Sequence, residues 1–267
     1  MIKDLKSFWS NYTPYKLHPE DEDYLGQNKQ KYCLEISIEN LRERYGKDLK
    51  SDTTREKFIN DEQNRNKILT NLFVVPFFGD VENAKIYILM GNPGFHTGDY
   101  VDEIEDKNYI ELIKKNLKLE LKTFKSLHSQ AINTGGYRYW SNKGRVPKIS
   151  KFLTNLNSQS SLRNYEYVKN SICVVESIAY HSCNKPSNEL YSLPSSKITK
   201  RLVNEYIQQK TDEGKAMCFI WRSVAFWNMK TNKNILIREP KKAQSQYFQN
   251  DEAEVMAKFL NKKMNND

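Results

Sequence analysis

The pattern of apolar residues along the chain changes near residue 71, where four short apolar runs begin to appear. Each run is nearly continuous rather than alternating, which is typical of strands buried on both faces, as in a parallel sheet. A further short stretch at residues 73–77 predicts an additional edge strand. The four runs are Ala84–Met90, Ile172–Ile178, Ala216–Trp221 and Asn234–Ile237.

Segments with apolar residues three and four positions apart lie between and after these runs, and this spacing predicts amphipathic helices. Strands that alternate with helices indicate βαβ crossovers. We therefore predict an α/β fold, a three-layer α/β/α sandwich with a central four-stranded, mainly parallel sheet. The apolar positions are Ile110, Ile113, Leu117, Leu121 and Phe124 in one helix, Ile198, Leu202, Val203 and Tyr206 in a second, and Val255, Met256, Phe259 and Leu260 in a third.

The first 70 residues are polar and helix-like, with several turn signals. They contain too few apolar residues to form a core alone. We predict that residues 1–70 form a helical N-terminal extension packed on an α/β/α domain of residues 71–267.

The composition suits a globular protein, because 28% of the 267 residues are charged and 12% are aromatic. No apolar run approaches the roughly 20 residues of a membrane helix, and the first residues lack the apolar stretch of a signal peptide. We therefore expect a cytoplasmic protein without a membrane partner. The four cysteines form no Cys-x-x-Cys pair and the four histidines show no ligand spacing, so we expect buried free thiols, no metal site and no cofactor.

A formal charge of +9 favours polyanionic partners, nucleic acid first. Part of the excess is local, and the lysines of the predicted helix are most simply a solvated face. A second basic group falls in the loop after the last predicted strand. The helix carries Lys114, Lys115, Lys118, Lys122 and Lys125, and the loop carries Arg238, Lys241 and Lys242.

Chemistry-bearing residues follow each predicted strand. The first strand is followed by Gly91-Asn92-Pro93-Gly94-Phe95, a tight Gly/Pro turn with one carboxamide, which also suits a purely structural turn. The second is followed by a segment that contains His181. Because ligands bind at the carboxyl ends of parallel strands, we expect these loops to converge on one site.

The strand order and this turn resemble the uracil-DNA glycosylase superfamily, nearest the mismatch-specific and thymine-DNA glycosylases. Their motif Gly-Ile-Asn-Pro-Gly matches Met90-Gly91-Asn92-Pro93-Gly94 at Asn, Pro and Gly, with the preceding Gly displaced by one. Their second motif, His-Pro-Ser or Asn-Pro-Ser after the last strand, is matched here only by the proline of Arg238-Glu239-Pro240-Lys241. The resemblance covers about residues 71 to 260.

The resemblance implies that Asn92 holds the water that attacks C1′ of a flipped nucleotide. His181 would replace the missing histidine of the second motif, although it also suits a structural, hydrogen-bonded histidine. Phe95 would stack on the flipped base, with core packing as its alternative. The other residues implied for the base pocket are Gly91, Pro93, Gly94, Tyr100, Glu176 and Ser177. A carboxylate at Glu176 would accept a hydrogen bond from an amino group such as cytosine N4.

By position, the loop after the last strand would contact DNA through Arg238, Glu239, Lys241, Lys242 and Gln244. The segment Gly135–Trp140 and the residues after it mix aromatic rings with positive charge, which suits contacts to a single strand or a flipped base. Buried aromatic anchors are the alternative there. The cations of this segment are Arg138, Lys143 and Arg145.

These observations predict a DNA glycosylase that flips out a mismatched, damaged or modified base and hydrolyses its N-glycosidic bond. Its partner would be duplex DNA with a flipped base, or single-stranded DNA. One option is a modified cytosine in foreign DNA, which would imply a role in phage defence. An inactive nucleic-acid-binding module of the same fold is the main alternative. A metal-dependent nuclease that uses Glu239 and Lys241 is a third.

Overall fold

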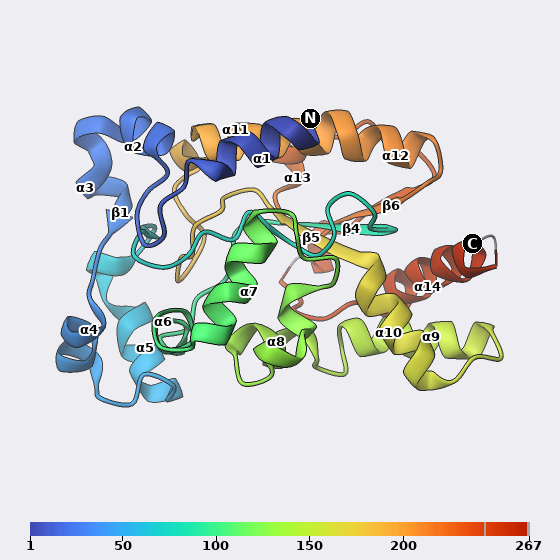
Figure 1. Cartoon of the computed structure of the whole chain (residues 1–267), viewed down its shortest axis with the longest axis horizontal. Coiled ribbons are helices and arrows are strands. Elements are labelled where there is room, and N and C mark those ends of the chain that lie inside the picture. Colours follow the sequence, from blue (N-terminus) through green and yellow to red (C-terminus); the bar gives the residue numbers. More distant parts are fainter. Residues whose placement is uncertain (243, 266–267) are drawn as a thin grey trace. The chain divides into compact units, whose positions relative to one another are not determined.

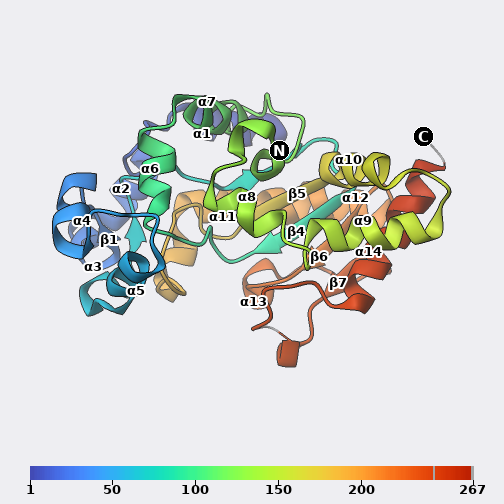
Figure 2. The ribbon, with the colours of Figure 1, turned by 90° about the horizontal axis from the view of Figure 1, so that it is seen from below.

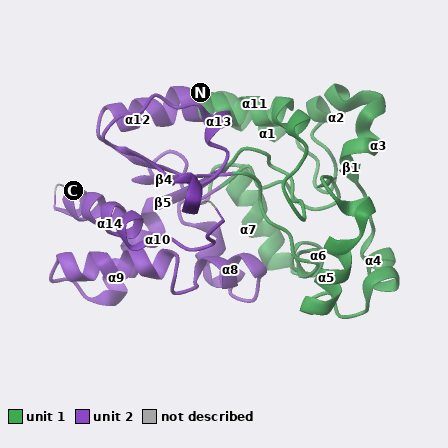
Figure 3. Cartoon of the chain, turned by 180° about the vertical axis from the view of Figure 1, so that it is seen from behind, with its two compact units in different colours: residues 1–77, 91–120, 176–202 green, residues 78–90, 121–175, 203–267 purple. Residues whose placement is uncertain are grey.

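The computed structural model describes residues 1–242 and 244–265. The chain divides into two compact units, which Figure 3 shows in different colours. Unit 1 contains residues 1–77, 91–120 and 176–202, and unit 2 contains residues 78–90, 121–175 and 203–267. The chain thus passes between the units several times, since the segments after two strands of unit 2 belong to unit 1.

The central sheet has five strands in the order β3-β5-β4-β6-β7. Figure 2 shows β5, β4, β6 and β7 following one another in that order. The register pairs Ile86 of β4 with Met217 of β6, and Cys218 of β6 with Ile235 of β7, both in parallel. The four predicted strands and the short edge strand are confirmed. Their bounds are β3 (Phe77–Phe78), β4 (Ile86–Met90), β5 (Ile172–Glu176), β6 (Met217–Ile220) and β7 (Ile235–Ile237).

The inner strands are apolar except for Glu176 at the end of β5, because both faces of the sheet are covered. All residues of β5 and β6 are buried, and so are all of β4 except Met90. At the edge, β7 is only half-buried. In Figure 1, α12 lies on one side of the strands of unit 2, and α9, α10 and α14 lie on the other. The predicted three-layer α/β/α architecture is therefore present.

The helices of unit 2 begin with standard capping chemistry where their sequences provide it. The Ser160 hydroxyl caps α10, and Gln249 with Glu252 forms a capping box at the start of α14. The α-helices are α8 (Gly135–Trp140), α9 (Val146–Leu156), α10 (Ser161–Ser171), α12 (Gln208–Asp212), α13 (Val224–Trp227) and α14 (Asn250–Met264). The 3₁₀ turns are η3 (Lys125–Leu127), η4 (Ser129–Ala131) and η7 (Pro240–Lys242), and a π-helix, η6 (Leu202–Ile207), precedes α12.

Unit 1 is mainly helical and contains a two-stranded parallel sheet of β1 and β2. One of its cores joins Leu41 and Phe58 of the N-terminal segment to Phe95 and Tyr100. The elements are α1 (Ile2–Ser10), α2 (Pro19–Leu25), η1 (Gly26–Asn28), α3 (Lys29–Tyr32), β1 (Cys33–Leu34), α4 (Ile38–Tyr45), α5 (Asp52–Asn60), η2 (Glu62–Asn64), β2 (Ile68–Leu69), α6 (Gly98–Ile104), α7 (Lys107–Leu117), η5 (Asn188–Ser192) and α11 (Pro194–Arg201).

The N-terminal segment is helical, as expected, and it packs with residues 91–120 and 176–202 in the same unit. The division into domains 1–70 and 71–267 stays a prediction, and the compact units run across it. Among the described residues, no helix is long and apolar enough to cross a membrane.

One predicted helix is shorter than its periodicity suggested. α7 ends at Leu117, because Leu119 takes a left-handed backbone conformation with φ of 60°. Lys122, expected on its solvated face, instead pairs with Asp80 and Glu82, and Lys125 is buried in a 3₁₀ turn. The helical spacing of apolar residues thus continues past the end of α7, and this spacing alone does not reveal the turn at Leu119.

Candidate functional site

The turn that follows β4 is held by the segment that follows β5. The Ser177 hydroxyl and the Ile178 N–H both donate to the carbonyl of Gly91, the latter at 3.0 Å. Pro93 is buried, whereas Gly94 is exposed and has open space where a Cβ would lie. The turn therefore presents Asn92 and Gly94 on a fixed backbone.

The carboxamide of Asn92 is half-buried and hydrogen-bonded on its nitrogen side. Its Nδ2 donates to the Ser182 hydroxyl and to the Pro93 carbonyl, each at 2.8 Å. The Ser182 hydroxyl in turn donates to the carbonyl of Asn184. No hydrogen bond to Asn92 Oδ1 is formed by the part of the chain that the structure describes. The amide oxygen is therefore the group left to accept a hydrogen bond from a bound molecule.

His181 is buried next to this turn, with a hydrogen bond at one ring nitrogen and an ion-pair contact without hydrogen-bond geometry at the other. Its Nδ1 donates to the Gly94 carbonyl at 2.7 Å, and its Nε2 lies 3.2 Å from Glu103 Oε1. Burial disfavours the imidazolium, but the charge of Glu103 outweighs it and raises the pKa of His181 to about 9. These contacts match the structural, hydrogen-bonded alternative for His181, and its catalytic contact with a departing base stays a prediction. His181 holds the turn in place.

Two further carboxyl groups lie in this part of unit 1. Burial raises the pKa of Asp99 to about 7, against the opposing charge of His181. Burial also raises the pKa of Glu176 to about 8, again with His181 opposing. Glu176 is only 3% exposed, and its Oε2 has no hydrogen-bond partner among the described residues. Glu176 is thus a neutral acid near pH 7, with one donor and one acceptor to offer.

Phe95, expected to stack on the flipped base, and Tyr100, expected to line the base pocket, are parts of the hydrophobic core. Their ring centroids lie 5.8 Å apart, and Phe95 also packs on Phe58 at 4.9 Å. The Tyr100 hydroxyl donates to Asn71 Oδ1 at 3.0 Å. The core-packing alternative for Phe95 is the correct one.

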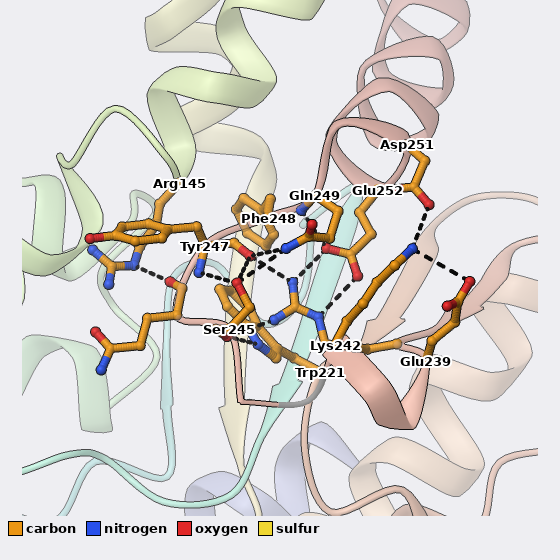
Figure 4. A network of polar contacts seen from close by, with 12 residues as sticks. Arg145, Trp221, Glu239, Lys242, Ser245, Tyr247, Phe248, Gln249, Asp251 and Glu252 are labelled. Atoms are coloured by element: carbon orange, nitrogen blue, oxygen red, sulfur yellow. Dashed lines mark hydrogen bonds and ion pairs between the residues drawn. The ribbon is translucent and has the colours of Figure 1, made fainter.

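The loop after β7, in unit 2, is anchored by a buried guanidinium. Arg238 Nε donates to Glu252 Oε1 at 2.9 Å, and its Nη2 lies 2.5 Å from Glu252 Oε2. Its remaining donors bond the carbonyls of Ser245 at 2.9 Å and Tyr247 at 3.0 Å. Figure 4 shows the surrounding network. The predicted DNA contact of Arg238 is therefore wrong, because its donors are used inside the protein.

Arg145 serves the same loop from α9's amino end. Its guanidinium carbon lies 3.3 Å from the centroid of the Tyr139 ring and 4.9 Å from that of Tyr247. Its Nε donates to the Gln246 carbonyl at 2.8 Å. Figure 4 shows Arg145 beside Tyr247. Arg145 is buried, so its predicted DNA contact is also wrong.

The other predicted DNA-binding residues are at the surface of unit 2, but part of their charge is neutralised. Glu239 lies 3.1 Å from Lys241 and 3.4 Å from Lys242, and Lys242 also lies 3.2 Å from Asp251. Lys241 keeps 80% of its side chain exposed. Arg138, Lys143 and Gln244 are exposed.

The structure thus forms two separate groups from the predicted site residues. Unit 1 brings together Gly91, Asn92, Pro93, Gly94, Ser177 and His181, with Glu176 at the end of β5. Unit 2 brings together Arg145, Arg238, Glu239, Lys241 and Lys242 around the last loop. The convergence of all four loops on one site stays a prediction.

Four residues of these groups were missed at the level of sequence. The spacing of Asp99 and Glu103 could have indicated that these two acids act together, since positions four apart on a helix share a face. Ser182 and Tyr247 carry none, because their roles depend on loop conformation. Tyr247 is 46% exposed and covers Gly144, where a Cβ would meet its ring at 2.4 Å.

No group of three or more His, Cys, Asp or Glu side chains that could hold a metal ion is found in residues 1–242 and 244–265. Comparisons with protein-family models, with curated proteins and with solved structures gave no match. The resemblance to the uracil-DNA glycosylase superfamily therefore rests on the turn after β4 and on the strand order.

Proposed function

We propose that the chain is a DNA glycosylase, which hydrolyses the N-glycosidic bond of a mismatched, damaged or modified base. The observation that carries this proposal is the orientation of the Asn92 amide. Its N–H groups are committed to Ser182 and Pro93, and its oxygen is the free end. An amide oxygen cannot remove a proton from water, but it accepts a hydrogen bond and fixes the water in line for attack.

The departing base carries negative charge in an oxocarbenium-like transition state, so a donor near it accelerates departure. His181 is unsuited to that role, because its charge is balanced by Glu103 at 3.2 Å. Glu176 suits it better. With its pKa raised to about 8 and Oε2 unpaired, it can donate a hydrogen bond to the base while its other oxygen accepts one. A modified cytosine in foreign DNA offers both an acceptor and an amino donor to these two oxygens of Glu176.

The second candidate is a nucleic-acid-binding module without activity. The observation that favours it lies in unit 2, where the half-exposed Tyr247 ring is stacked on Arg145 and Arg138 and Lys143 are exposed. Aromatic rings beside cations are typical of surfaces that bind single strands. The nuclease alternative would require Glu239 to leave its ion pairs with Lys241 and Lys242.

The test incubates the protein with duplexes that carry uracil, mismatched thymine or a modified cytosine, and measures free base and abasic sites. We expect base release without strand cleavage, and we expect Asn92→Ala to reduce the single-turnover rate by about 100-fold or more because the water loses its fixed position. The control is Asn155→Ala, which removes an exposed amide of α9 and should leave the rate unchanged.

Each alternative outcome identifies a different function. Retention of full base release by Asn92→Ala would refute the assignment of the water to Asn92. Binding of the duplexes with no product would favour the module, and magnesium-dependent strand breaks would favour the nuclease.

A further inference from the structure

We propose that Ser182 is a positioning residue, whose hydroxyl sets which end of the Asn92 amide faces the reacting water. The inference rests on the proposed function for its catalytic consequence. Its structural part stands on the hydrogen bonds around the two side chains.

The direction of every hydrogen bond in this group follows from which atoms carry protons. The Asn184 carbonyl can only accept, so the Ser182 hydroxyl must donate its single proton there. Ser182 Oγ is then left only as an acceptor. The Asn92 side-chain atom 2.8 Å away must therefore be the NH₂ group, and the Pro93 carbonyl at 2.8 Å demands the same.

The hydrogen bonds have to select the orientation of the Asn92 amide because its oxygen and NH₂ ends differ little in shape. A carboxamide turns about a broad, roughly two-fold torsion, and the reversed amide would present donors to the water. A donor cannot orient the lone pair of the water toward C1′ in the way that an accepting oxygen does. Ser182 makes the reversed state costly, because two acceptors would then face each other.

Ser182 is itself held rigidly. It is buried, and it follows His181, whose carbonyl accepts the Leu69 N–H at 2.8 Å in an isolated β-bridge. The Asn184 side chain accepts the Asn66 N–H at 3.1 Å, which fixes the residue that receives the Ser182 proton. The orientation of Asn92 is thus supported through Ser182 by backbone of the N-terminal segment.

The experiment is a double-mutant cycle in single-turnover base release, on whichever of the three duplexes the wild type cleaves best. Ser182→Ala and Ser182→Thr are each made with Asn92 and with Asn92→Asp. A carboxylate has two equivalent oxygens, so Ser182 cannot select which end of Asn92→Asp faces the water. Either orientation places an acceptor against the Pro93 carbonyl, so Asn92→Asp should itself be slower than the wild type. We therefore expect Ser182→Ala to slow release about 10- to 100-fold with Asn92 but less than about 3-fold with Asn92→Asp.

Binding and rescue separate positioning from a structural role. We expect the KM of Ser182→Ala to stay within about 3-fold of the wild-type value, because the amide acts on the water and not on DNA affinity. Ser182→Thr retains the hydroxyl and should retain most of the rate. If Asn92→Asp is itself inactive, the contrast between Ser182→Thr and Ser182→Ala decides the question.

The inference is overturned if Ser182→Ala costs the same in both backgrounds, or costs nothing while Asn92→Ala abolishes release. Loss of the proposed function gives a different result, namely no base release by the wild type on any duplex. In that event the side-chain NH₂ signal of Asn92 in ¹⁵N-labelled protein tests the contact alone. Faster proton exchange in Ser182→Ala than in Ser182→Thr would support it, and equal exchange would overturn it.

Discussion

Two of the ion pairs among the described residues bury both the carboxylate and the cation, and their surroundings differ. In unit 2, Glu252 faces Arg238, and the other donors of that guanidinium bond the carbonyls of Ser245 and Tyr247. In unit 1, Glu103 faces His181, and the nearby Glu176 keeps an unpaired oxygen. The carboxylate and guanidinium of the first group are hydrogen-bonded within the protein, whereas the second group contains a buried oxygen without a hydrogen-bond partner.

The difference separates an anchor from a site. Buried polar groups in native proteins are almost always hydrogen-bonded, so a fully paired network contributes rigidity, whereas an unpaired buried group calls for a ligand or a reaction. By this criterion the Arg238 network fixes the last loop. The group around Asn92 includes the buried, unpaired Oε2 of Glu176, and it is where we place the chemistry.

The largest effect should come from breaking the anchor. Arg238→Ala leaves the Glu252 carboxylate buried without its partner, and removal of one partner from a buried pair costs about 3–5 kcal/mol of unfolding free energy. Urea unfolding followed by circular dichroism measures the loss.

Two controls isolate the buried charge as the cause. Lys242→Ala breaks ion pairs at the surface and should change the free energy of unfolding by less than about 1 kcal/mol. The double variant Arg238→Ala/Glu252→Ala should lose less than the sum of the two single changes. Strict additivity would mean that the two side chains stabilise the protein independently.

The sequence predicts the sheet well and the site only in part. Continuous apolar runs specified the four main strands because burial on both faces leaves no polar positions. The same apolar pattern could not show that Leu119 would end α7, since a left-handed residue changes the direction of the chain without changing its composition. The turn around Asn92 was recognised because its glycines and proline lie directly after a strand.

The role of each charged residue depended on its partners, which sequence does not give. Arg238 and Arg145 were expected at a DNA surface, but the carbonyls that they bond belong to a loop that closes over them. Phe95 was expected in a pocket, but Phe58 of the N-terminal segment packs on it. In each case a contact distant in sequence decided whether the side chain is buried.

Glu103→Gln should lower the unfolding free energy by a smaller amount, because His181 can release its proton when the Glu103 carboxylate is removed. The pKa of His181, about 9, lies above the unfolded value of 6.5, so the pair stabilises the protein fully below pH 6.5, and this contribution is lost as the pH rises through 9. We expect Glu103→Gln to cost about 2 kcal/mol at pH 6 and under 0.5 kcal/mol at pH 9.5.

Thermal or urea unfolding at pH 6 and pH 9.5 measures the change in unfolding free energy. Asp99 and Glu176, the other acids of the group, are left unchanged in the variant. A cost for Glu103→Gln that is the same at pH 6 and at pH 9.5 would show that His181 is not charged in the folded protein. The Glu103–His181 contact would then be a neutral contact and not an ion pair.

The smallest effect concerns Glu176, which has no cation of its own. Its folded pKa of about 8 exceeds the ordinary value of 4.5, so the folded state keeps a proton that the unfolded state releases. Stability from this group is present below pH 4.5 and is lost as the pH rises through 8, with a slope of at most about 1.4 kcal/mol per pH unit.

Glu176→Gln removes this loss, but its NH₂ group must be accommodated where Oε2 has no partner. We therefore expect a net gain of only about 1 kcal/mol at pH 8, with a shallower dependence on pH between 5 and 8. If Glu176 also donates to the departing base, the same variant will release base more slowly although it is more stable. Greater stability with unchanged base release would instead make Glu176 an acid that burial alone keeps neutral, and would remove it from the site.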